Sequence, residues 1–305
     1  MKPLKWVAIV AIAGFGVLAQ AQDYTKKFNT AKPELDRLMA SMQYGDVVEK
    51  VKAILPPAIP DFPKNPANPQ VTVNNYFELG SIQDFHEYLY KALLASGDTE
   101  SAIACAKKTE EIAKRNAADA EAGLRPTIDS WSAAIPASKK SLEEAPAIQE
   151  KLEAEKAQLQ ASKAKLLGKR TEDKIKGKEK EHLDALNKDI AANEEDLASL
   201  AKSITDCNNN LVMAPKMIDQ LNGFISTAKK DAARFAQETK DMETDFAAEQ
   251  DAIAKKGKGK YVSTSLDSAK TMELKEKVRL LNRLAFLEPN NNHVRKQLDA
   301  ALLGK

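Results

Sequence analysis

The chain of 305 residues is poor in aromatic side chains, which make up 6% of it, while charged residues make up 30%. This composition favours long solvated helices over a thick globular core. The charges nearly balance, at 46 Lys+Arg against 44 Asp+Glu, and loss of Lys2 and Lys5 with an N-terminal leader would leave 44 of each. General nucleic-acid binding requires a basic surface that releases counterions. We therefore expect no nucleic acid among the partners.

Residues that usually carry catalysis or bind metals are also scarce. The three histidines, His86, His182 and His293, are widely scattered. The stretch FHEYLY at 85–90 begins like the zinc-binding helix HExxH, but Tyr90 stands where the second histidine is needed. The motifs GxSxG and GxxxxGK[ST] are absent. We therefore expect no enzyme activity, no catalytic residues, no metal and no cofactor.

Only two cysteines occur, Cys105 and Cys207. An oxidising compartment permits a disulfide between them. Alternatively, each is a small buried residue on its own helix. The sequence leaves both readings open, because cysteine pairing cannot be deduced from spacing.

Long hydrophobic runs are missing except at the N-terminus. The apolar run from Trp6 to Leu18 follows two lysines and precedes the small-x-small sequence Ala19–Ala21. It is shorter than the about 20 residues that cross a bilayer. Residues 1–21 are therefore predicted to be a signal peptide cleaved before Gln22. We expect an exported bacterial protein, periplasmic or extracellular, with a eukaryotic secreted protein as the alternative.

Apolar residues at helical spacing predict two helical hairpins in the N-terminal part. The first occupies residues 22–55, with a break at Tyr44–Asp46. The second lies in a base segment, 76–136, and turns at Ser96–Asp98.

Gly97-Asp98, followed by Ala102 and Ala106, resembles the turn and second helix of a tetratricopeptide repeat. The C-terminal sequence LLNRLAFLEPNNNHVRKQLDAALLGK resembles a last repeat helix, a stop at Pro289 and a solvating cap helix. The resemblance covers 76–116 and about 271–303, and Leu89 is the one match to the family's first-helix signature. It implies a base of stacked hairpins, closed by residues 266–305, that binds other proteins.

Five prolines recur at every third residue from Pro57 to Pro69, which is the period of a polyproline II helix. We expect a proline-rich strut over 56–75, docked on the helices and held by Phe62. A free linker and a ligand for an aromatic groove of a partner are the alternatives.

A coiled coil is predicted over 137–265, because apolar residues recur in sevens between charged flanks. Leu152 and Leu166 belong to its first helix, Asn193 is a polar core position of the second, and Pro215 is expected to start a third that contains Phe246 in its seam. A compact helical bundle is the alternative. The heptad phase changes around Gly168–Gly177, which favours a hairpin there over one continuous helix.

Two lysine-rich clusters flank the predicted turns, and the hairpin arrangement would place both at one end of the rod. The candidate anion- or partner-binding residues are Lys255, Lys256, Lys258, Lys260, Lys169, Arg170, Lys174, Lys176 and Lys178. Like charges held close together favour binding of an anionic partner. The alternative is that both clusters are ordinary solubilising turns.

The expected fold is therefore all-α, with a helical-hairpin, tetratricopeptide-like base and a protruding antiparallel coiled coil. The expected function is that of a non-enzymatic structural or adaptor protein that binds other proteins through the base and the coiled coil. The alternative is a binder of anionic envelope polymer or lipid through a basic coiled-coil tip. The sequence leaves the oligomeric state open.

Overall fold

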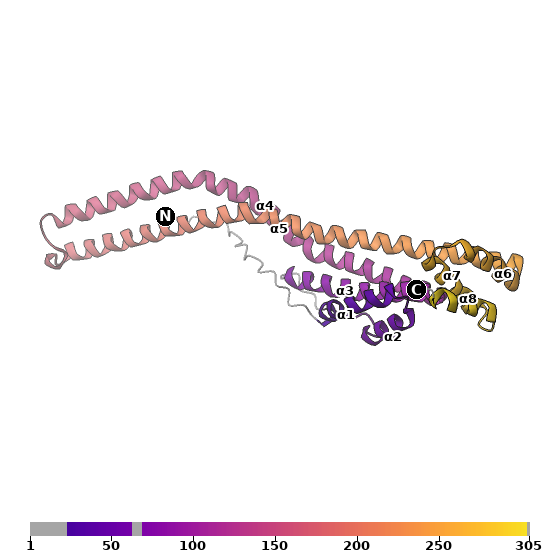
Figure 1. The fold of residues 1–305 in the computed structure, drawn as a ribbon. Helices are drawn as coiled ribbons and strands as arrows, with labels where there is room; N and C mark the ends of the chain where they lie inside the picture. Colours follow the sequence, from indigo (N-terminus) through magenta and orange to yellow (C-terminus); the bar gives the residue numbers. More distant parts are fainter. Residues whose placement is uncertain (1–22, 63–68, 304–305) are drawn as a thin grey trace. The chain divides into compact units, whose positions relative to one another are not determined.

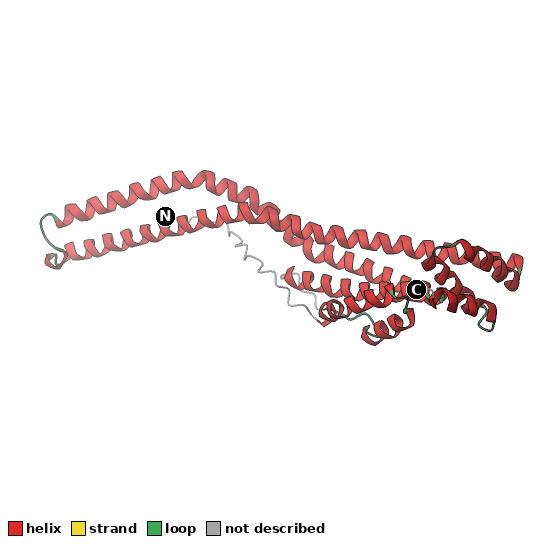
Figure 2. Cartoon of the chain, in the orientation of Figure 1, coloured by secondary structure: helices red, strands yellow, loops and turns green. Residues whose placement is uncertain are grey.

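The computed structural model describes residues 23–62 and 69–303. The predicted signal peptide, 1–21, lies outside the described residues. All regular structure in the described ranges is helical, without a strand (Figures 1 and 2). The protein is all-α, as predicted, with a helical-hairpin base and an antiparallel coiled coil.

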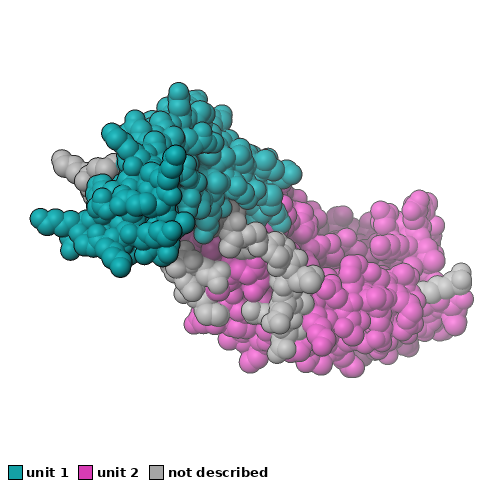
Figure 3. All heavy atoms as spheres, turned by 90° about the vertical axis from the view of Figure 1, so that its left-hand side faces the viewer, with its two compact units in different colours: residues 1–16, 127–222 teal, residues 17–126, 223–305 magenta. Residues whose placement is uncertain are grey.

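The chain divides into two compact units (Figure 3). The described part of unit 1 is 127–222, and that of unit 2 is 23–62, 69–126 and 223–303. The predicted boundary at 136/137 falls inside a helix, and the one at 265/266 falls inside another. The two units instead divide at 126/127 and 222/223.

The first hairpin consists of α1 (Asp23–Ala40) and α2 (Tyr44–Ile54). Its turn lies at 41–43, ahead of the predicted break at Tyr44–Asp46. Met42 has a φ of 58°, and the amide of Gln43 donates to the carbonyl of Leu38 at 2.9 Å. Tyr44 is buried at 4% exposure, so it belongs to the packed face of α2 and not to the turn.

Helix α3 (Pro69–Ala95) begins within the predicted strut. Proline suits the first helical position, because its missing N–H would have no partner there. The strut is therefore shorter than expected. Its described part ends at Phe62, which packs against Leu79, Ile82 and Ile112, as the docked reading predicted. Residues 63–68 lie outside the described ranges.

Two long helices follow, α4 (Thr99–Leu167) and α5 (Lys178–Lys256). The predicted break near Pro136 and the predicted helix start at Pro215 were both wrong. The prolines inside these helices, Pro126, Pro136, Pro146 and Pro215, are all exposed. An exposed proline removes one helical hydrogen bond and keeps the apolar seam intact. The heptad phase indeed continues past Pro215 through buried Ala214 and Leu221.

In unit 1, α4 and α5 form an antiparallel pair, as the hairpin prediction stated. A 3₁₀ turn, η1 (Glu172–Lys174), lies in the connection. Asn193 of α5 donates to the carbonyl of Leu152 of α4 at 3.1 Å. Asn193 is 5% exposed, so the predicted polar core position is confirmed.

In unit 2, the N-terminal hairpin, α3 and the start of α4 share one core with the end of α5 and three C-terminal helices. These are α6 (Lys258–Ser268), α7 (Leu274–Leu287) and α8 (Asn292–Leu303), joined across η2 (Ala269–Thr271) and the predicted stop at Pro289. The largest fully buried side chains include Phe85 and Phe235. Phe246, predicted to lie in the seam, is half-buried.

Candidate binding surfaces

The two lysine-rich clusters lie in different units. Residues 169–178 connect α4 and α5 in unit 1, whereas residues 255–260 join α5 to α6 in unit 2. The predicted meeting of both clusters at one end of the rod required a third helix to begin at Pro215. The predicted helix start is wrong, because α5 continues through this proline to Lys256.

Ion pairs occupy part of the unit 1 cluster. Arg170 donates to both carboxylate oxygens of Glu179, at 2.8 and 3.4 Å. Glu172 pairs with Lys163 of α4 at 2.6 Å. Four exposed lysines of this cluster have no ion pair within the described residues, and we call them the tip lysines: Lys169, Lys174, Lys176 and Lys178.

The local backbone points most of the tip lysines outward. Gly168 and Gly177, with φ of 57° and 61°, let the chain leave α4 and enter α5. Between them, Ile175 is extended (φ −86°, ψ 130°) and its side chain is buried at 3% exposure. Lys174, the last residue of the 3₁₀ turn, and Lys176 lie on either side of Ile175 and are both exposed.

The unit 2 cluster surrounds Gly257, whose φ of 77° turns the chain from α5 into α6. Lys255 pairs with Asp251 at 2.5 Å. Lys256, Lys258 and Lys260 are exposed and without an ion pair to any described residue. This cluster is therefore accessible, and it belongs to unit 2, whereas the tip lysines belong to unit 1.

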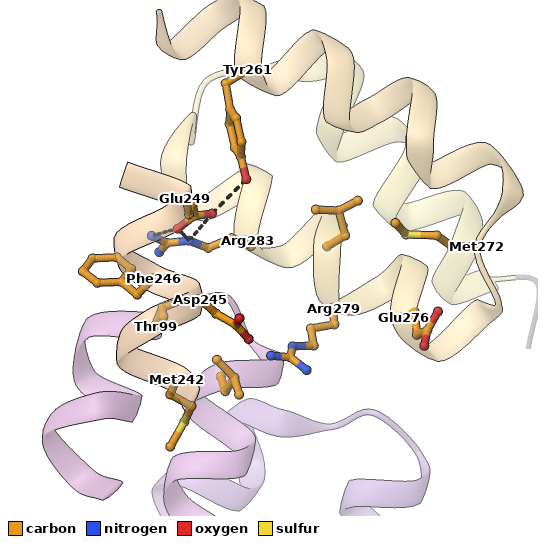
Figure 4. Close-up of a pocket in the computed structure, with 12 residues that line it drawn as sticks. Thr99, Met242, Asp245, Phe246, Glu249, Tyr261, Met272, Glu276, Arg279 and Arg283 are labelled. Atoms are coloured by element: carbon orange, nitrogen blue, oxygen red, sulfur yellow. Dashed lines mark hydrogen bonds and ion pairs between the residues drawn. The ribbon is translucent and has the colours of Figure 1, made fainter. Parts of the chain in front are cut away.

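Unit 2 also contains a hollow of about 350 Å³ that sequence reasoning missed (Figure 4). It lies between the start of α4, the end of α5, α6 and α7. Its lining combines apolar side chains with several charged ones. The apolar members are Leu94, Met242, Phe246, Met272 and Leu280.

A buried ion-pair network forms one wall of the hollow. Arg283 of α7 is 6% exposed and contacts Glu249 of α5, with its Nη2 2.7 Å from Oε2. Its Nη1 donates to the carbonyl of Gly97 at 2.9 Å and to Glu100 at 3.1 Å. The hydroxyl of Tyr261 donates to Glu249 at 3.3 Å. The network holds α7 and α6 against α5 and the α3–α4 turn.

Other charged groups that line the hollow take no part in this ion-pair network. Arg279 and Asp245 point toward one another in the hollow (Figure 4), and neither has an ion pair within the described ranges. Glu276 lines the same space. The hollow therefore combines an apolar lining, called its floor, with charged groups of both signs, called its rim.

The Cys105–His86 contact in unit 2 is structural and not a reactive thiolate–imidazolium pair. The Cys105 Sγ lies 3.5 Å from His86 Nδ1. Burial raises the pKa of the Cys105 thiol to about 12, and burial, followed by nearby Lys108, lowers the pKa of His86 to about 4. Both groups are therefore neutral near pH 7. Cys105 and Cys207 are both free, so the possible disulfide is not formed.

A second titratable cluster lies where α3 faces α5. Burial, followed by the charges of Glu87 and Asp231, raises the pKa of Asp84 to about 7. Arg234 opposes this shift, and it contacts both oxygens of Glu87 at 3.1 and 3.0 Å. This arrangement concentrates acid around one guanidinium.

Within 23–62 and 69–303, no helix combines the length and apolar character needed to cross a membrane. The same residues hold no group of His, Cys, Asp or Glu side chains placed to bind a metal ion. Comparisons with protein-family models, curated proteins and solved structures found no match. The resemblance to tetratricopeptide repeats therefore stays a prediction.

The hollow had one signal in the sequence. Glu249 occupies a seam position in the heptad pattern of α5, where an apolar residue is the rule. A carboxylate at such a position requires a buried cation as its partner. The identity of that partner, Arg283, depends on the tertiary packing of α7.

Proposed function

We propose that this chain is an exported, non-enzymatic structural or adaptor protein that binds other proteins through its helical base. The observation that supports this best is the hollow in unit 2. Methionine and phenylalanine side chains form its floor, and methionine adapts its shape to varied apolar partners. Half-exposed Phe286, at 49% exposure, lies beside Arg283 with the guanidinium 5.6 Å from its ring.

The charged rim supports a protein partner over an apolar small molecule. Interfaces typically combine an apolar centre with polar groups at the edge and an enrichment of Arg and Met. The rim groups Arg279, Asp245 and Glu276 can pair with partner charges of either sign. The coiled coil of unit 1 offers a further helical surface, consistent with a scaffold.

The proposal can be tested by photo-crosslinking in the native host. A photoreactive residue replaces Met272, which lines the hollow at 38% exposure, and a matched control replaces exposed Ser263 on α6. We expect discrete protein adducts at position 272 that weaken when Phe246→Ala removes part of the floor. Absence of adducts at 272, or equal adducts at both positions, would refute binding through the hollow.

A second candidate function is binding of anionic envelope polymer or lipid through the tip lysines. This candidate is supported by four lysines that lie within ten residues of one another. None of them has an ion pair within the described part of the chain. Co-sedimentation with anionic vesicles or acidic polymer at low and physiological salt tests this candidate. Binding at neither salt concentration would exclude it.

A further inference from the structure

We infer that the tip of unit 1 binds a flexible, hydrated linear polyanion, such as a phosphate polymer, in preference to a membrane surface. This inference rests on the second candidate function and assigns its ligand class. The tip is defined as residues 168–180, which connect the two helices of the coiled coil.

The arrangement of the tip lysines favours a chain of charges over a single anion. Lys174 ends the 3₁₀ turn, Lys176 lies in the connection and Lys178 begins α5, so exposed lysines recur at every second residue through the turn. All four tip lysines are exposed, so a lone phosphate bound to one of them would stay largely in solvent. A polymer that touches several lysines at once gains from multivalency.

The tip also lacks the groups that anchor a protein in a bilayer. Its one apolar residue with a large side chain is Ile175, and that side chain is buried in the turn. Stable interfacial binding combines basic residues with exposed apolar side chains that enter the acyl boundary. The tip can therefore meet an anionic surface only through charge, which leaves a flexible polymer as the better ligand.

Most acidic side chains of the tip form ion pairs with other residues of the protein, so they do not neutralise the tip lysines. Glu179 is held by Arg170 and Glu172 by Lys163. Asp173 is the remaining acid between Gly168 and Lys178, and it stands against four unpaired lysines. The local field is consequently positive although the whole chain is close to neutral.

The experiment compares two quadruple variants of equal charge in the full-length mature chain. The tip variant is K169Q/K174Q/K176Q/K178Q, and the matched control is K255Q/K256Q/K258Q/K260Q at the α5–α6 turn of unit 2. Probes are inorganic polyphosphate of about 50 units, inorganic phosphate at equal phosphate concentration, and vesicles with anionic lipid. Binding is measured at about 20 mM and 150 mM salt, and circular dichroism verifies that each variant is folded.

We expect polyphosphate to bind the wild type and the matched control with similar affinity, and the tip variant at least about tenfold more weakly at low salt. Binding should fall at 150 mM salt, where exposed charges are screened within about 8 Å. Inorganic phosphate should not compete at equal phosphate concentration.

Three results would overturn the inference. Equal losses in both variants would show that affinity follows net charge and not the tip. Tip-dependent binding to vesicles with none to polyphosphate would assign a membrane and leave the second candidate function standing. No binding of the wild type to either probe at low salt would remove both the inference and that function.

Discussion

At the scale of single residues, unit 2 concentrates its unusual electrostatics at two places. One is the Arg283–Glu249 pair, in which an almost fully buried guanidinium contacts a carboxylate whose side chain is 14% exposed. The other is Asp84, whose pKa is raised to about 7. The two places affect stability in different ways. Breaking the buried pair leaves a buried charge without a partner, whereas protonation of Asp84 removes a buried charge.

Glu249→Gln should destabilise unit 2 by about 3 kcal/mol, because Arg283 would keep its burial and lose its main anionic partner. The free energy is measured from denaturant unfolding. The control is Glu243→Gln on the same helix, whose pair with Lys107 is exposed and should contribute no more than about 1 kcal/mol. Equal effects of the two substitutions would show that the buried network does not hold α7 to α5.

Asp84→Asn should stabilise the protein at pH 8 by about 2 kcal/mol. The raised pKa means that the folded state binds the Asp84 proton more tightly than the unfolded chain does. Stability is therefore lost as pH rises from about 4 through about 7, and the loss is complete above that range. Between pH 4 and 8, the free energy of unfolding of the variant should depend less on pH than that of the wild type. A steeper profile in Asp84→Asn would contradict the assignment.

At the scale of elements, two features decide how the long helices behave. The seam of unit 1 is thin and contains buried Asn193, whose Oδ1 has no hydrogen bond within the described residues. Helix α5 contains Pro215 at an exposed position between buried Ala214 and Met217. The first feature concerns the register of the pair, and the second concerns the continuity of one helix.

Asn193→Leu should raise the stability of unit 1 by about 1 kcal/mol and loosen its register, because a buried polar residue in a seam selects one alignment at some cost in stability. Spin labels at Ala154 and Ala191 measure this by the width of their distance distribution. The wild type should show one short distance, and the variant a broader one. A wild-type separation near about 55 Å, as one continuous helix would give, would contradict the hairpin itself.

Pro215→Ala should stabilise α5 by up to about 3 kcal/mol, because alanine restores the amide that can donate to the carbonyl of Leu211 and has the highest helix propensity. Thermal melting followed by circular dichroism measures the change. The matched control is Pro289→Ala, which lies between α7 and α8 where the helix already ends. A lowered melting temperature in Pro215→Ala would mean that a bend at this proline is required for packing.

At the scale of the whole molecule, one mass measurement tests both the predicted leader and the two free cysteines. Intact mass of the exported protein should correspond to residues 22–305 with both cysteines as thiols. A disulfide would lower that mass by two hydrogens. Retention of residues 1–21 would contradict the leader, and a missing pair of hydrogens would contradict the free thiols.

Much of the architecture follows from short-range pattern. Heptads from Leu183 onward predicted the coiled coil, the phase change at Gly168–Gly177 predicted its turn, and Pro289 predicted the stop before α8. These features could be predicted because hydrophobic periodicity and turn chemistry act over a few residues and depend little on the tertiary context. The candidate lysines of the tip could be identified from the sequence for the same reason.

Tertiary structure alone decided whether the prolines interrupt the helices. A proline removes one hydrogen bond, whereas a long seam buries apolar side chains on both sides of it, so the continuous helix prevails at Pro136 and Pro215. That outcome removed the third helix on which the predicted meeting of the two lysine clusters depended. Tertiary packing also brought Glu249 to Arg283, a residue 34 positions away, and both side chains line the hollow. Local pattern cannot specify such a pair, because its energy exists only once α7 has packed against α5.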